Sequence, residues 1–374
     1  MTDRFDFVVV GGGIAGMSIG AELAAHASVA VLEAEDAPGY HATGRSVAFW
    51  EESYGGPAVQ PLTTTSGPML AAPDPAFSET GFLSPRGALH IGPAEAAVGA
   101  SDFVDLYAGL GLAVRRVDRA AMTNLVPGLL PAWTVGVLEP SCRDIDASAL
   151  LAAYHRQLIR RGGRLHCRAA VRTIARVAAG WRVETTEGVF SGAVLVNAAG
   201  AWADEIARLA GADTVGIAPL RRTVVQLRTE PAAPADMPLI MDLGGRFYFK
   251  SVGGGRLWLT PHDEEPQPPG DAAPDELAVA TAIDRLEKVV DWRVIAVERK
   301  WAGLRSFAPD RAPVYGFDPG VSGFFWFAGQ GGFGIQTAPA AALIGSALAL
   351  GRAPDARVAH VDLRAYRPDR FRTI

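Results

Sequence analysis

Cysteine, lysine and long hydrophobic runs are all scarce in this chain of 374 residues. Its two cysteines, Cys142 and Cys167, are too few for a disulfide framework. No group of cysteines and histidines has the spacing of a metal site, so we predict that no metal is bound. With so few cysteines, the expected compartment is the cytoplasm.

The composition also excludes several classes of protein. Hydrophobic residues make up 49% and charged residues 20%, which is typical of a globular protein. A formal net charge of -5, with lysine only at Lys250, Lys288 and Lys300, gives no indication of nucleic-acid binding. No apolar run reaches the ~20 residues that cross a bilayer, and Asp3 and Asp6 interrupt any signal-peptide core. We expect no transmembrane segment, while peripheral contact with a membrane stays open.

The N-terminal segment has the pattern of a dinucleotide-binding βαβ unit. An apolar strand over residues 5–10 precedes a glycine-rich turn at 11–16, and a helix follows. A second apolar strand, at 29–32, ends on Glu33. Strand, turn, helix and terminal acid therefore occur in the order that such a site needs.

Each residue type in this unit has a physical role. Gly11 permits the sharp turn, Gly13 lets the backbone approach a pyrophosphate, and Gly16 lets the helix pack closely on the strand. The amides of the helix start, at Ile14 and Ala15, then face the phosphates. The carboxylate of Glu33 can accept hydrogen bonds from ribose hydroxyls and would repel a 2′-phosphate, so FAD or NAD fits better than NADP.

Three later segments point to the same nucleotide site. A polar stretch at 40–46 offers Thr43, Arg45 and Ser46 to phosphate groups. A buried strand at 193–196 leads into Asn-Ala-Ala-Gly-Ala-Trp, and a strand at 323–328 leads into Gln-Gly-Gly-Phe-Gly before an alanine-rich helix. Both ends of the chain are therefore expected to contribute to one site.

The middle of the chain predicts a second architecture. Strands are expected at 223–228, 246–251 and 256–260, and a proline- and acid-rich surface loop at 262–274 precedes a helix at 276–290. An antiparallel sheet that forms a second domain is therefore expected.

Seven segments resemble the D-amino-acid oxidase superfamily of flavoproteins over nearly the whole chain, and most of all its bacterial catabolic D-arginine dehydrogenases. They are GGGIAG at 11–16 with Glu33, YHATGRS at 40–46, VLVNAAGAW at 194–202, RR at 221–222, FYFK at 247–250, WAGLRSF at 301–307 and GQGGFGIQT at 329–337. The resemblance implies an α/β, Rossmann-like FAD-binding domain of the glutathione-reductase type and an antiparallel α+β substrate domain. The FAD-binding domain would be discontinuous and comprise 1–80, 145–215 and 300–374, and the substrate domain would comprise 81–144 and 216–299. We expect non-covalent FAD, since no cysteine falls near these motifs. The implied FAD-binding residues are Gly11, Gly13, Ile14, Ala15, Gly16, Glu33, Thr43, Gly44, Arg45, Ser46, Ala199, Gly200, Trp202, Arg305, Gly331, Gly332, Phe333, Gly334 and Ile335.

The resemblance also implies five residues around the substrate: Tyr54, Tyr248, Arg222, Arg305 and Gly332. A guanidinium pairs bidentately with a carboxylate. Because Arg305 stands among apolar residues, we expect it to bind an anion. The alternative is a structural salt bridge. Arg222 has a neighbour of the same type, Arg221, so one of the two is expected to face solvent. Taken alone, Tyr248 is as compatible with core packing as with catalysis.

The substrate pocket departs from that of the D-arginine dehydrogenases. Phe49 stands where they have a histidine and Leu239 where they have a methionine, and no carboxylate stands near Gly87 and Ala88 to pair with a guanidinium. An unpaired guanidinium is costly to bury, so D-arginine is not the expected substrate. The predicted pocket residues are Phe49, Trp50, Ala88, Leu239 and Arg246, of which the apolar ones suit an apolar side chain.

Polar alternatives for the pocket stay open. Arg246 and His90 are compatible with an anionic or polar side chain. Glu51 and Glu52 could attract a cation, although a charged pair before a turn is usually solvated.

We therefore predict FAD-dependent oxidative deamination of a D-amino acid, by hydride transfer to flavin N5, giving an imino acid and then a 2-oxo acid and ammonia. The electron acceptor would be a quinone or oxygen. One alternative is an oxidase of glycine, sarcosine or other amines that uses oxygen. Another is a flavoprotein that binds FAD as a redox sensor without turnover.

Overall fold

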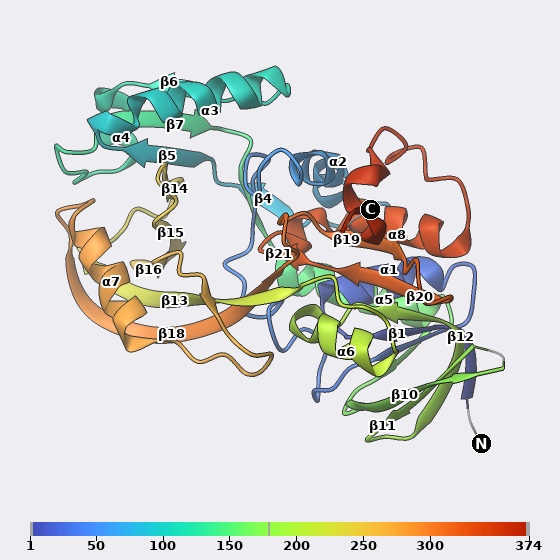
Figure 1. Ribbon diagram of the computed structural model, residues 1–374. Coiled ribbons are helices and arrows are strands. Elements are labelled where there is room, and N and C mark those ends of the chain that lie inside the picture. The colour runs from blue at the N-terminus through green and yellow to red at the C-terminus, as the bar shows by residue number, and fades with distance from the viewer. Residues whose placement is uncertain (1–2, 179, 372–374) are drawn as a thin grey trace.

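The computed structural model describes residues 3–178 and 180–371, which form two large sheets that lie side by side (Figure 1). The first is an eight-stranded, mixed sheet in the order β10-β11-β12-β1-β2-β9, with β20 joined to β12 and β19 to β20. Its strands are β1 (Asp3–Val10), β2 (Val29–Leu32), β9 (Arg164–His166), β10 (Val171–Val177), β11 (Gly180–Thr185), β12 (Val189–Asn197), β19 (Val314–Phe317) and β20 (Phe324–Ala328).

The centre of this sheet is parallel, because β1 pairs in parallel with both β2 and β12, and β12 with β20. Side chains of β1 alternate between two separate cores: Phe7 and Val9 enter one, and Val8 and Val10 the other. Such burial on both faces explains why the strand reads as a continuous apolar run.

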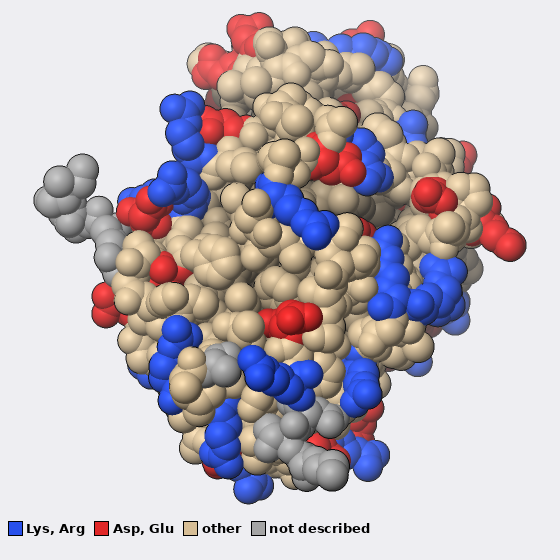
Figure 2. All heavy atoms as spheres, turned by 90° about the vertical axis from the view of Figure 1, so that its right-hand side faces the viewer, with Lys and Arg blue, Asp and Glu red and all other residues tan. Residues whose placement is uncertain are grey.

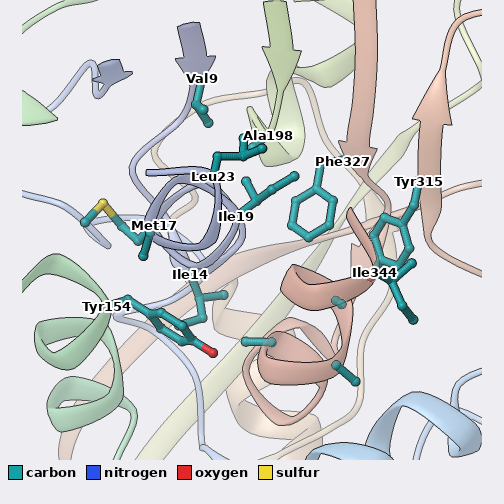
Figure 3. Close-up of a cluster of buried hydrophobic side chains, with 14 of the residues drawn as sticks. Val9, Ile14, Met17, Ile19, Leu23, Tyr154, Ala198, Tyr315, Phe327 and Ile344 are labelled. Atoms are coloured by element: carbon teal, nitrogen blue, oxygen red, sulfur yellow. The ribbon is translucent and has the colours of Figure 1, made fainter. Parts of the chain in front are cut away.

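Helices from distant parts of the chain cover one face of the sheet. Figure 3 shows Ile14, Met17 and Ile19 of the first helix beside Tyr154, Phe327 and Ile344. The helices of the described residues are α1 (Ile14–Leu23), α2 (Gln60–Ala71), α3 (Ala97–Gly109), α4 (Arg119–Leu125), α5 (Ala147–Arg160), α6 (Ala203–Leu209), α7 (Glu276–Glu287) and α8 (Gly334–Leu350), with short 3₁₀ turns η1 (Ala94–Ala96), η2 (Gly200–Trp202), η3 (Leu363–Tyr366) and η4 (Pro368–Phe371).

The second sheet is ten-stranded and largely antiparallel, in the order β21-β18-β13-β16-β15-β14-β5-β7-β6, with β17 against β13. Its strands are β5 (Ala88–Gly92), β6 (Arg115–Val117), β7 (Val135–Glu139), β13 (Ala218–Glu230), β14 (Leu239–Asp242), β15 (Tyr248–Gly253), β16 (Arg256–Thr260), β17 (Glu265–Pro266), β18 (Arg293–Phe307) and β21 (Gln330–Gly331). A small third sheet holds β3 (Phe49–Trp50), β4 (Leu83–Pro85) and β8 (Arg143–Ile145).

This architecture agrees with the predicted fold class, with local differences. The strand expected at 246–251 is β15, shifted by two residues, and the helix expected at 276–290 ends at Glu287 as α7. The expected domain division stays a prediction; its boundary at residue 300 falls within β18. No helix among the described residues is both long and apolar enough to cross a membrane. Basic and acidic side chains are interspersed over the face shown in Figure 2.

Candidate functional site

A large cavity of about 430 Å³ lies where the first strands of the parallel sheet end. Its walls include the ends of β1 and β2, the start of α1, the loop after β12 and the residues around β21. Clefts at the carboxyl ends of parallel strands are the usual ligand sites of such sheets. The four glycine-rich or polar segments singled out in the sequence therefore meet at one cavity.

Close backbone contacts explain two of the glycines of the first turn. Gly11 has a φ of +108°, and a Cβ atom there would lie 2.4 Å from the carbonyl oxygen of Ala198. A Cβ atom on Gly16 would lie 1.8 Å from the carbonyl oxygen of Gly11. Gly13 differs, because the nearest protein atom to its Cβ position is Thr43 Oγ1, at 3.4 Å, and the residue lines the cavity. The space beside Gly13 is thus left for a ligand.

Glu33 lies at the end of β2, is buried and lines the cavity. Its Oε2 accepts a hydrogen bond from the Gly12 amide at 2.7 Å, and its Oε1 accepts one from the Glu35 amide at 2.9 Å. Each carboxylate oxygen can accept a further bond. This carboxylate, beside a glycine turn and the open amides of a helix start, fits the adenosine half of a dinucleotide.

Most of the predicted cofactor residues line this cavity, and three do not. The lining residues are Gly11, Gly13, Ile14, Ala15, Glu33, Thr43, Arg45, Ser46, Ala199, Gly200, Trp202, Arg305, Gly331, Gly332, Gly334 and Ile335. Gly16 lies beneath the turn, and the Gly44 amide donates to the carbonyl of Gly39. The ring of Phe333 contacts Tyr54 and Phe307.

Arg45 lines the cavity, but its guanidinium already has protein partners. It donates to the carbonyl oxygens of Ala302, at 3.0 Å, and Ala272, at 3.1 Å, and pairs with the carboxylate of Asp271. Arg45 therefore anchors the 262–274 loop over the cavity. Sequence reasoning did not assign this loop to the site, although Gly270 and Ala272 line the cavity, and it also left out His41 and Gln330.

The two predicted substrate arginines lie on neighbouring strands. Arg222 of β13 pairs in register with Gly303, and Arg305 of β18 pairs with Leu220, so both side chains stand on the same face of the sheet. Arg221 stands on the other face, where it pairs with Asp263 and is only 15% exposed. The expectation that one of the adjacent arginines faces solvent was therefore wrong.

Both substrate arginines are buried and incompletely paired. Arg222 donates through Nε to the Asp263 carbonyl and through Nη2 to Glu264, each at 2.9 Å, but its Nη1 has no hydrogen-bond partner among the described residues. Arg305 Nε also lacks one. Buried guanidinium N–H groups rarely remain unpaired, so each of these donors is open to an acceptor.

Arg305 also lines a second, very small cavity of about 10 Å³, with which the large cavity shares four residues. The lining comprises Ser46, Val47, Ala48, Phe49, Tyr54, Tyr248, Arg305, Gly332, Ile335 and Gln336. Four of the five predicted substrate residues, all except Arg222, therefore meet at this space.

Aromatic rings form one wall of the small cavity. The rings of Phe49 and Tyr54 lie 4.9 Å apart, and those of Phe49 and Tyr248 lie 5.6 Å apart, both edge to face. Burial raises the pKa of Tyr54, and the positive charges of Arg222 and Arg305 offset this only in part. Tyr54 is therefore a neutral hydrogen-bond donor near neutral pH.

The remaining predicted pocket residues divide into two groups. Ala88 and Leu239 pack behind Phe49 and Tyr248 in one apolar cluster. Trp50 and Arg246 lie elsewhere: the indole of Trp50 donates to the Thr63 carbonyl. Arg246 is 53% exposed and pairs with Asp242.

The structure places two acidic residues near the pocket. Glu51 is fully buried, so of the two alternatives left open for it the structure rules out solvation. Glu139, which is distant in sequence, pairs across the sheet with Ala88 and so brings a carboxylate near Ala88 in the fold. Neither acid lines either cavity.

Comparison with known proteins gives close structural likenesses over the full length. Glycine oxidase of Geobacillus kaustophilus (strain HTA426) is 27% identical over 366 residues, which cover 92% of each protein. The crystal structure of glycine oxidase from Geobacillus kaustophilus has a TM-score of 0.84 at 23% identity and covers 98% of both chains. L-Proline dehydrogenase from P. horikoshii has a TM-score of 0.84 at 21% identity, covering 99% of this chain and 98% of that one.

Another relative matches more locally. FAD-dependent oxidoreductase domain-containing protein 1 of Bos taurus is 30% identical over 164 residues, 40% of this chain and 34% of that protein, so the match spans about a third of that relative. The family described as FAD dependent oxidoreductase (DAO) matches residues 6–348. Because this match covers most of the 374 residues, the chain belongs to the FAD-dependent oxidoreductase family and its cofactor is FAD.

Proposed function

We propose that the protein oxidises the carbon–nitrogen bond of a small D-amino acid with an apolar side chain, producing an imino acid that water hydrolyses to a 2-oxo acid and ammonia. The observation that carries this proposal is the pair of buried, unpartnered donors, Arg222 Nη1 and Arg305 Nε. A substrate carboxylate would supply the missing acceptors for both, through charge-assisted hydrogen bonds.

The chain's own residues would bind and orient the substrate. Arg305 and Arg222 would hold the carboxylate, and the backbone at Gly332 and the hydroxyls of Tyr54 and Tyr248 would face the amine. FAD, when bound, supplies the hydride acceptor. The first amides of α8, at Gly334 and Ile335, line the cavity without a side-chain cap, so the helix dipole favours negative charge there.

The walls favour a small, apolar side chain. Phe49, Tyr54 and Tyr248 leave only about 10 Å³ of free space, and the cluster behind them is apolar. The nearby carboxylates, Glu51 and Glu139, are fully buried behind this wall and close to His90. D-Arginine would have to displace that wall, so the resemblance to D-arginine dehydrogenases is proposed to extend to the carboxylate clamp but not to the side-chain pocket.

Glycine or sarcosine is the second candidate substrate. A relative that matches over 92% of each chain is named glycine oxidase. The electron acceptor is proposed to be a quinone or oxygen. FAD is proposed to be non-covalent, since Cys142 and Cys167 are absent from the cavity lining of the described residues. A role as a redox sensor without turnover would not explain why two buried arginine donors lack an acceptor.

Anaerobic mixing of the purified FAD-loaded protein with candidate substrates tests the proposal. The panel comprises D- and L-amino acids, glycine, sarcosine and simple amines, and the readout is bleaching of the flavin's visible absorbance. We expect rapid bleaching with small apolar D-amino acids and none with D-arginine. Bleaching only by amines that lack a carboxylate would contradict the arginine clamp, and bleaching by L-amino acids alone would contradict the stereochemistry. Reoxidation by oxygen or by a quinone then identifies the acceptor.

A further inference from the structure

Three ionisable side chains that play no part in the proposed reaction converge behind the pocket wall. Glu51 follows β3, His90 lies in β5 and Glu139 ends β7. His90 Nε2 lies 2.9 Å from Glu51 Oε1 and 4.0 Å from Glu139 Oε2, and the three ligand atoms all lie within 4.8 Å of one another.

The sheet register explains the convergence. Ala88 pairs with Glu139 and His90 with Val137 on the antiparallel strands β5 and β7, so His90 and Glu139 are diagonal neighbours on one face. The turn after β3 brings Glu51 onto this face, and its amide hydrogen bonds to Gln336 Oε1 of α8 at 3.3 Å. The three residues are far apart in sequence, which is why their spacing did not predict a metal site.

The cluster is buried, and apart from the ion-pair contacts of His90 its facing polar atoms have no partner among the described residues. Glu51 and Glu139 are fully buried and His90 is 6% exposed. Among the described residues, Glu51 Oε2 has no hydrogen-bond partner. Glu51 Oε1 and Glu139 Oε2 form no hydrogen bond and have only their ion-pair contacts with His90 Nε2. Native proteins seldom leave so many buried polar atoms unpaired in one place.

We propose that Glu51, His90 and Glu139 form a binding site for a divalent transition-metal cation such as Zn²⁺. Atoms bound to one ion at about 2.0–2.2 Å lie at most about 4.4 Å apart. Both distances from His90 Nε2 are within that limit, and because the three atoms together lie within 4.8 Å of one another, only a small movement of the carboxylates would be needed to bind an ion. One imidazole nitrogen and two carboxylates suit zinc, iron or manganese. Two carboxylates and a neutral imidazole carry a charge that a divalent ion cancels, which removes the cost of burying them.

Neighbouring groups support the ligands. Glu139 Oε1 accepts a hydrogen bond from the Glu52 amide at 2.9 Å, which orients its carboxylate and leaves Oε2 facing His90. The ring of Phe103 lies 4.7 Å from that of His90 and screens the imidazole. The Tyr54 amide donates a hydrogen bond to the Glu51 carbonyl. An ion bound by Glu51, His90 and Glu139 would therefore connect the turn that carries Tyr54 to the ten-stranded sheet.

Protons are the competing occupants of the cluster. Burial, and after it the negative charge of Glu51, raise the pKa of Glu139 to about 7. Protonated Glu139 beside a Glu51–His90 ion pair would also reduce the net charge. The substitution Glu139→Gln separates the two cases, since the amide resembles the protonated acid in shape but is a poor metal ligand.

The test uses the full-length FAD-loaded protein, treated with a chelator, dialysed and then equilibrated with Zn²⁺. Zinc per chain is measured by mass spectrometry, and Tm is measured with and without Zn²⁺. We expect about one zinc per chain in the wild type and a rise in Tm on zinc addition. In Glu139→Gln and Glu51→Gln, zinc affinity should fall at least ~10-fold and the rise in Tm should disappear.

Glu95→Gln is the matched control, because Glu95 is an exposed acid a few residues beyond β5 and outside the cluster. It should bind zinc as the wild type does. Should Glu51→Gln fail to fold, Glu139→Gln still decides the question. No stoichiometric zinc in the wild type, or equal zinc binding by the wild type and Glu139→Gln, would overturn the proposal.

Discussion

At the scale of single residues, the unpaired donors of Arg222 and Arg305 carry the most functional information. Arg222 already donates hydrogen bonds to Glu264 and to the Asp263 carbonyl, which fix its guanidinium. Its Nη1 remains without a hydrogen-bond partner among the described residues. A guanidinium that is already oriented loses less rotamer freedom when it binds a carboxylate. Sequence reasoning identified both arginines by resemblance, but only the register of β13 and β18 shows that they share a face.

Gly13 and Gly16 should respond differently to the same substitution. In Gly13→Ala the new methyl group meets only Thr43 Oγ1, at 3.4 Å, but protrudes into the cavity. We expect near-normal stability of the apoprotein and FAD affinity reduced at least ~10-fold, measured by fluorescence titration. Gly16→Ala, whose methyl would lie 1.8 Å from a carbonyl oxygen, should destabilise the fold itself. Unchanged FAD affinity in Gly13→Ala would contradict the assigned pyrophosphate position.

His262 should make stability depend on pH. Burial, and after it the charge of Arg222, lower the pKa of His262 to about 4. The unfolded chain binds a proton near pH 6.5, so the free energy of unfolding should fall as pH drops from about 6.5 to about 4, by on the order of 2 kcal/mol. His262→Gln should flatten this part of the profile in chemical denaturation. An identical profile in wild type and variant would show that His262 is not the group responsible.

At the scale of elements, local pattern predicted the βαβ unit and the glycine turns, but not the helix α2. Its sequence, QPLTTTSGPMLA, contains threonine, glycine and proline, which are poor helix formers. Packing against the rest of the core stabilises it, with Leu62 and Leu70 fully buried. The strands β13 and β18 also extend well beyond their apolar segments, because each is the other's main partner.

The 262–274 loop joins the two ends of the site. Asp263 and Glu264 hold Arg222, while Asp271 and Ala272 bind Arg45 beside the cofactor cavity. The resemblance and the turn signals could not reveal this, because the partners are more than 200 residues apart at the Arg45 end.

Removing the ion pair between Asp271 and Arg45 should increase the rate of FAD dissociation slightly. Asp271 is 61% exposed, so its ion pair with Arg45 contributes at most about 1 kcal/mol. In Asp271→Asn we expect FAD to dissociate about 2–5 times faster in stopped-flow measurements, with an effect that shrinks at high salt. The control is Glu276→Gln, which removes another exposed ion pair, with Lys300. Equal rates in the two variants would argue against a closing role for the loop.

At the scale of the whole molecule, the candidate site residues come from two sheets with separate cores and lie at the boundary between these sheets. The parallel sheet supplies the glycine turn and Glu33, and the antiparallel sheet supplies Arg222, Tyr248 and Arg305. The sequence was sufficient to predict the two architectures and FAD. It could not predict the buried cluster of Glu51, His90 and Glu139, since only tertiary structure brings these residues together.

The most direct test of the arginine clamp compares two substrates on Arg305→Met. The substrates are the best D-amino acid of the panel and the amine that lacks only its carboxylate, and the measurement is the anaerobic rate of flavin bleaching. Arg246→Met, which removes an exposed guanidinium that lines neither cavity, is the control. We predict a loss of roughly 10²–10³-fold in bleaching efficiency for the amino acid and little change for the amine. An equal loss for both substrates would contradict the account, because Arg305 would then act on something other than the carboxylate.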